Sequence, residues 1–140
     1  MSEATVRELE AFYGGYLDAF NRDDADAFAR AFSYPNAMLT ATHGMLLQAN
    51  ESETKAFLQG AIAALHARGW ERSGVDRLQI WPFSDEMAMV IADITRYAGD
   101  GAVFDQGRAC YMVRREGGDW KIVTFTEMKP PFSEATVQIG

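Results

Sequence analysis

The hydrophobic pattern of this chain changes its period about halfway along, and the change predicts the order of the elements. In the first third, apolar residues recur at helical spacing. They are Val6, Leu9, Tyr13, Tyr16, Leu17 and Phe20. A polar corner at 21–24 interrupts the pattern, and a second helical stripe follows it. That stripe consists of Ala27, Phe28, Ala31 and Phe32. Two amphipathic helices are therefore expected, the second ending at Pro35.

A short strand and a third helix are predicted next. The strand covers 37–42, and the chain turns at 43–44. Asn50 is a typical N-cap residue, and Gly69 is expected just beyond the end of the helix. The apolar stripe of this helix is Phe57, Leu58, Ala61, Ile62 and Leu65.

Beyond Arg72 the pattern becomes strand-like. Short turns rich in Gly, Asp and Ser separate the segments, which is typical of antiparallel hairpins. Pro82 and Gly107 are the candidates for the bend that a curved sheet requires. The predicted strands are 75–83, 87–97, 103–115 and 120–128.

This order of elements predicts an α+β fold, in which a cone-shaped, curved antiparallel sheet wraps around the N-terminal helices. The chain has 140 residues, of which 48% are hydrophobic, so one domain spanning 1–140 with its own core is expected. We see no linker or internal repeat in the sequence.

Charge and cysteine content exclude several classes of function. The formal net charge is −7 and no Lys/Arg cluster is present, so neither nucleic acid nor a membrane is an expected partner. The lone Cys110 cannot form an internal disulfide and is expected to be a small core residue. The polar N-terminus lacks the features of a signal peptide, and a cytoplasmic location is expected.

Several short motifs are spread along nearly the whole chain. They lie at 16–21, 24–28, Phe32, 96–97, 99–101, 111–115 and 118–123. In this order and spacing they resemble motifs of the nuclear transport factor 2-like superfamily, in its SnoaL-like and ketosteroid-isomerase-like branch. The resemblance implies an α+β barrel of the cystatin-like type, a deep pocket between sheet and helices, and a homodimer formed through the sheet.

The resemblance does not transfer the known isomerase mechanism. Ketosteroid isomerase uses an aspartate base and an oxyanion hole made by a tyrosine and a protonated aspartate. Tyr16 matches the family tyrosine, but alignment places Thr40 at the base and Ala109 near the second aspartate. Neither side chain can replace a carboxyl group in these roles.

Asp93 is one candidate for moving protons beside a carbonyl that Tyr16 would orient or polarise. It lies in the apolar segment 89–94, where burial would raise its pKa and suit it to acid–base chemistry. The alternative is a structural aspartate, either exposed on the outer sheet face or paired with Arg96 or Arg108.

Glu127 is a second candidate for moving protons. Strand alternation places Phe125 and Glu127 on the same face of the sheet, so both would face a pocket together. The alternative is a salt bridge at the rim with Lys129 or Arg108.

Aromatic side chains and the imidazole of a histidine could bind a flat apolar ligand. The alternative is that the aromatic residues simply fill the cone. No metal-ligand spacing, phosphate loop or nucleophile motif is present, so neither a metal nor a cofactor is predicted. The predicted ligand-binding residues are Tyr13, His43, Trp81, Tyr111 and Phe125.

The sequence thus predicts a pocket protein for a small apolar or aromatic molecule. Its expected chemistry is that of a cofactor-free isomerase, cyclase or dehydratase acting on an apolar carbonyl compound. The alternative is a non-catalytic ligand-binding or dimerisation module. In that case apolar residues of the outer sheet face, such as Met89, Met112 or Ile122, would meet a second copy.

Overall fold

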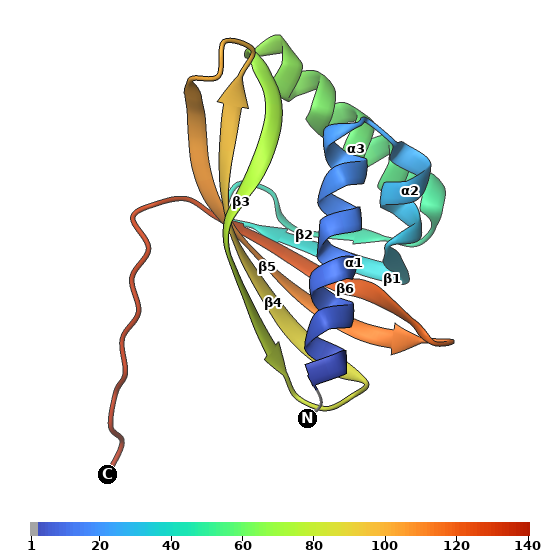
Figure 1. The fold of residues 1–140 in the computed structure, drawn as a ribbon, viewed down its shortest axis with the longest axis vertical. Helices are drawn as coiled ribbons and strands as arrows, with labels where there is room; N and C mark the ends of the chain where they lie inside the picture. Colours follow the sequence, from blue (N-terminus) through green and yellow to red (C-terminus); the bar gives the residue numbers. More distant parts are fainter. Residues whose placement is uncertain (1–2) are drawn as a thin grey trace.

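The computed structural model describes residues 3–140, and the predicted α+β fold is confirmed. Figure 1 shows the three helices of this region on one side of a curved, unclosed sheet, with an extended C-terminal segment leading away from it. The elements are α1 (Glu3–Asn21), α2 (Ala25–Arg30), β1 (Phe32–Thr40), β2 (Gly44–Gln48), α3 (Glu51–Ala67), β3 (Trp70–Pro82), β4 (Met87–Ala98), β5 (Val103–Glu116) and β6 (Asp119–Met128).

The start of α2 and both ends of α3 lie at residues suited to capping a helix. At the start of α2, the Asp24 carboxylate accepts a hydrogen bond from the backbone N–H of Ala27 at 3.0 Å. Asn50 caps α3 in the same way, accepting from the N–H of Glu53 at 3.0 Å. Gly69 follows the last turn of α3 with a φ of +99°, which favours glycine.

The second helix is shorter than its apolar stripe predicts. It ends at Arg30, and Phe32 already belongs to β1, well before Pro35. The reason is tertiary: the backbone N–H of Ile122 donates to the carbonyl oxygen of Ala31 at 2.8 Å, so β6 draws this segment into the sheet.

The sheet has the strand order β2-β1-β6-β5-β4-β3. The four long strands β3 to β6 form consecutive antiparallel hairpins, as the turn residues predict. Two features depart from the prediction: β2 is an additional strand paired with β1, and β1 runs parallel to β6. The sheet is therefore mixed, and its first and last strands in chain order, β1 and β6, lie side by side within it.

Register irregularities interrupt the sheet at positions other than Pro82 and Gly107. The pairing of β3 with β4 shifts between Val75 and Arg77, and that of β5 with β6 shifts between Met112 and Val113. Such bulges bend a strand and increase its local twist. Pro82 instead ends β3.

The core lies between the helices and the concave face of the sheet. Ile122 is only 1% exposed and belongs to this core, so its predicted place on the outer sheet face is wrong. Among the described residues, none of the helices combines the length and apolarity needed to cross a bilayer. The largest side chains below 2% exposure include Trp70, Leu9, Met38 and Leu58.

Candidate active site

A cavity of about 680 Å³ opens between α1, α3 and the concave face of the sheet. We call it the cone cavity. Its walls are largely apolar and aromatic, and a few polar side chains reach into it, as is typical of small-molecule sites. Six of the eight residues predicted for the site lie in its lining. They are Tyr13, Tyr16, His43, Tyr111, Phe125 and Glu127.

Tyr13, Tyr16 and Tyr111 form a compact tyrosine cluster in the wall of the cavity. Tyr13 and Tyr16 come from one face of α1, three positions apart, and Tyr111 from β5. The ring centroids lie 5.4–5.6 Å apart. The hydroxyl groups are close enough for each to affect the pKa values of the others. The three phenols therefore act as one polar unit inside an aromatic wall.

Burial fixes the protonation state of this cluster. It raises the pKa of Tyr13 to about 12 and raises the pKa values of Tyr16 and Tyr111 as well, because a phenolate would lose its hydration. All three phenols consequently stay protonated at neutral pH. A protonated phenol can donate a hydrogen bond to a ligand oxygen on which negative charge develops.

Glu127 faces the same cavity, as the alternation with Phe125 predicts. Its carboxylate lies 3.2 Å from a guanidinium nitrogen of Arg96, so its partner is neither Lys129 nor Arg108. Arg96 also contacts Asp105 at 3.3 Å. The Glu127 side chain is 29% exposed, which leaves its carboxylate accessible from the cavity.

Arg96 is a site residue that sequence reasoning missed. Its position in β4, two residues after Ile94, places both side chains on the concave face. The buried Nε atom of Arg96 has no hydrogen-bond partner within residues 3–140. The alternation Ile94–Arg96 was a usable signal, but the sequence alone does not reveal which face of β4 is concave.

Asp93 lies on the outer sheet face, the face turned away from the helices, and does not line the cavity. Its carboxylate accepts from two nitrogens of Arg108 at 2.6 and 3.3 Å. Hydrogen bonding to Arg108 lowers the pKa of Asp93, opposite to the shift expected for a buried acid–base group. Asp93 is therefore a structural aspartate paired with Arg108, which was the alternative to a role in proton transfer.

Trp81 and Cys110 also occupy the outer sheet face. Trp81 pairs with Met89 across β3 and β4 and is 52% exposed, so it does not contribute to the cavity wall. Cys110 is half-buried on β5 and is not part of the core. His43, by contrast, lies at the cavity rim and is exposed to solvent.

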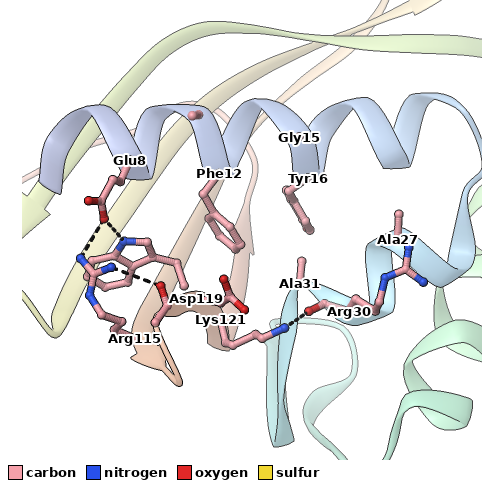
Figure 2. A pocket seen from close by; sticks show the side chains of 13 residues that line it. Glu8, Phe12, Gly15, Tyr16, Ala27, Arg30, Ala31, Arg115, Asp119 and Lys121 are labelled. Carbon is pink, nitrogen blue, oxygen red and sulfur yellow. Dashed lines mark hydrogen bonds and ion pairs between the residues drawn. The ribbon is translucent and has the colours of Figure 1, made fainter. Parts of the chain in front are cut away.

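A second, shallower hollow of about 630 Å³ lies between α1, α2 and the β5–β6 turn (Figure 2). The Glu8 carboxylate closes one end, accepting from Arg115 at 2.8 Å and from the indole N–H of Trp120 at 3.3 Å. At the other end, the Lys121 ammonium donates to the carbonyl oxygen of Arg30. Tyr16 lines both this hollow and the cone cavity.

No group of three or more His, Cys, Asp or Glu side chains within the described part of the chain is arranged to hold a metal ion. The polar groups of the cone cavity instead include three phenols, one carboxylate, several cations, the imidazole of His43 and the hydroxyl groups of Thr40 and Ser73. These groups suit hydrogen bonding and proton transfer.

Solved structures share this fold at low sequence identity. Aln2 from a Streptomyces species matches with a TM-score of 0.75 and 18% identity, covering 92% of this chain and 93% of Aln2. A domain of unknown function with a cystatin-like fold from Nostoc punctiforme matches with a TM-score of 0.73 and 20% identity, covering 94% and 81%. An NTF2-like protein with a cystatin-like fold from Novosphingobium aromaticivorans matches with a TM-score of 0.73 and 13% identity, covering 93% and 84%.

Sequence comparison agrees with the fold. No functionally curated protein matches the chain. The sequence profile described as NTF2-like protein (DUF6841) matches residues 7–130, which is most of the chain. The chain therefore belongs to this NTF2-like family.

Proposed function

We propose that the protein binds an apolar, aromatic carbonyl compound in the cone cavity and catalyses a cofactor-free proton transfer on it. Isomerisation, cyclisation and dehydration are reactions of this class. The observation that carries the proposal is the placement of three protonated phenols and one carboxylate around a single apolar cavity. The alternative is a ligand-binding protein that uses the same cavity without chemistry.

In this proposal the tyrosine cluster stabilises the carbonyl oxygen while Glu127 moves the proton. Tyr16 and Tyr111 would donate to the oxygen, where a fixed donor in a water-poor site is most effective. Glu127 would take a proton from the carbon beside the carbonyl and return one to the product. Arg96, which contacts Glu127 at 3.2 Å, would hold the carboxylate in place as a positioning residue.

The sheet register supports Glu127 as a substitute for the missing family carboxylates. Thr40 and Ala109, the positions at which the resemblance expects aspartates, both line the cone cavity. Ala109 pairs directly with Glu127 across β5 and β6. The small alanine side chain therefore stands beside a carboxylate supplied by the neighbouring strand.

Deuterium incorporation into 2-tetralone tests the proposal without knowledge of the natural substrate. This ketone is apolar, and removal of a proton beside its carbonyl is followed by uptake of a deuteron from D₂O. We expect the protein to accelerate exchange, as measured by NMR, above the rate in buffer. Ala61→Trp, which places an indole in the cavity wall, is expected to abolish the acceleration.

Ala63→Trp is the matched control, because Ala63 lies on the same helix, is exposed and does not line the cavity. It is expected to retain the wild-type rate of exchange. Exchange no faster than in buffer with the wild-type protein would contradict the proposed catalysis. Equal rates for the two tryptophan variants would place the reaction outside the cavity.

We also propose that the protein forms a homodimer through the outer sheet face. Met89 pairs with Met112 on this face, and Ile91 pairs with Cys110 beside them. All four side chains are only partly buried within one chain. A second copy would cover this apolar surface, which adjoins the exposed Trp81.

Met112→Arg is expected to raise the dimer dissociation constant about tenfold or more, because it places a charge in an apolar contact. Sedimentation velocity over a range of micromolar concentrations would measure the change. Ala63→Arg adds the same charge at an exposed position of α3 and should leave the dimer dissociation constant unchanged. A wild-type protein that sediments as a monomer throughout would contradict the proposed interface.

A further inference from the structure

The charge of the cone cavity lining is opposite in sign to the charge of the whole chain. The chain contains 13 Lys and Arg residues and 20 Asp and Glu residues. The cavity lining, however, includes four cationic residues and one acidic residue, Glu127, within residues 3–140. The four are Arg68, Arg96, Arg108 and Lys129, of which Arg108 has its side chain on the outer sheet face beside Asp93. An acidic protein thus presents a basic cavity lining.

Two of these cations are neutralised within the chain. Arg108 is paired with Asp93, and Arg96 is shared between Asp105 and Glu127. Their charges are therefore largely satisfied before any ligand arrives.

The other two cations remain available. No carboxylate of the described chain lies within 4.0 Å of Arg68, whose guanidinium is held 4.9 Å above the ring of Phe104. Lys129 has only a 3.9 Å contact with Asp105, a carboxylate that Arg96 already contacts more closely. Both cations line the cavity from exposed positions, where they can meet an incoming ligand.

The spacing of residues along the chain separates Lys129 from the tyrosine cluster. Phe125 contacts Tyr111 at a centroid distance of 5.4 Å, and Glu127 and Lys129 follow it at every second position. At about 3.3 Å per residue, Phe125 and Lys129 are about 13 Å apart along the chain. A ligand that contacts both ends of this distance must be extended and carry polar groups at opposite ends.

We propose that the ligand of the cone cavity is an aromatic acid whose anionic group binds Arg68 and Lys129 at the mouth. Its rings occupy the apolar cavity, and its other end reaches the tyrosine cluster. This inference rests on the proposed function of the cavity as a small-molecule site and adds the charge class of the ligand. A carboxylate accepts charge-assisted hydrogen bonds from both cations, which a neutral ligand cannot do.

Two fluorescent dyes with the same aromatic body test the proposal. 1-Anilinonaphthalene-8-sulfonate carries an anionic group, and N-phenyl-1-naphthylamine lacks it. We expect the double variant Arg68→Gln, Lys129→Gln to bind the anionic dye about tenfold more weakly, because it loses charged hydrogen bonds. Its affinity for the neutral dye is expected to change less than about twofold, because the apolar walls are intact.

The control removes the same amount of charge outside the cavity. Arg72 stacks on Tyr97 at 4.1 Å and Arg77 is exposed on β3, and neither lines the cavity. The double variant Arg72→Gln, Arg77→Gln should leave the affinities for both dyes unchanged. An equal loss of anionic dye binding in the two double variants would overturn the proposal, since net charge alone would then explain it.

The Ala61→Trp variant separates this inference from the proposed function. If the neutral dye binds and Ala61→Trp displaces it, the cavity is a small-molecule site. Unchanged affinity for the anionic dye in Arg68→Gln, Lys129→Gln would then overturn only the anionic class of ligand. Failure of both dyes to bind, or binding that Ala61→Trp does not weaken, would contradict the cavity as the site and this inference with it.

Discussion

Replacing Glu127 with glutamine is expected to slow deuterium incorporation into 2-tetralone by about 10²–10⁴-fold, the usual contribution of a positioned general base. Glutamine has nearly the same shape but cannot accept the proton. The side chain would keep its place opposite Ala109, so the cavity and its affinity for the ketone should be preserved. NMR exchange rates at saturating ketone would measure the effect on the chemical step.

Asp93→Asn is the matched control for this prediction. It makes the same chemical change in a carboxylate that lies on the outer sheet face and binds Arg108 at 2.6 Å. Exchange should therefore continue at close to the wild-type rate, even if the lost ion pair lowers the stability. A loss of exchange in Asp93→Asn equal to that in Glu127→Gln, with both variants folded, would remove Glu127 from the proposed role.

The second large effect is a steep loss of stability at alkaline pH. An unfolded tyrosine ionises near pH 10. Within the folded tyrosine cluster, burial raises the pKa of Tyr13 to about 12 and also raises that of Tyr16 and of Tyr111. Above about pH 10 the unfolded chain therefore binds fewer protons than the folded protein, so the free energy of unfolding falls as the pH rises.

Each buried tyrosine should contribute a slope of roughly 1 kcal/mol per pH unit between its unfolded and folded pKa values. Urea unfolding from pH 8 to 11 would measure the total slope. Tyr13→Phe removes one ionisable phenol, so the slope above about pH 10 should become shallower by that amount. A stability that stays level to pH 11, or a Tyr13→Phe slope equal to that of wild type, would contradict a protonated, buried cluster.

The order of elements was predictable because each local pattern agrees with the final structure. Asp24, Asn50 and Gly69 mark helix ends through backbone chemistry that acts within a few residues. The hairpins β3 to β6 follow from short turns in the same way. The end of α2 was not predictable, because Ala31 accepts its hydrogen bond from Ile122, far along the chain.

The site was predictable only where sequence spacing places two candidate residues on the same face of one helix or strand. Tyr13 and Tyr16 share a face of α1, and Phe125 and Glu127 share a face of β6. Asp93 was misleading because apolar residues occupy both faces of β4. Val90 and Ala92 face the core, while Met89 and Ile91 lie on the outer sheet face. Alternation separates the two faces of such a strand but does not say which one is concave.

The parallel pairing of β1 with β6 has a consequence for how the protein is made. Phe32 pairs with Ile122, and Met38 pairs with Phe125. These contacts within the sheet join residues that lie far apart in the sequence, so the ribosome synthesises the second partner long after the first. Contacts of such long sequence separation slow folding, because a large loop must close before they form. On the ribosome, Tyr13 and Tyr16 of α1 lack their partner Tyr111 until β5 has emerged. The aromatic surface of a nascent chain is therefore expected to stay uncovered until translation has passed β5 and β6, and only then could the chain bind a ligand.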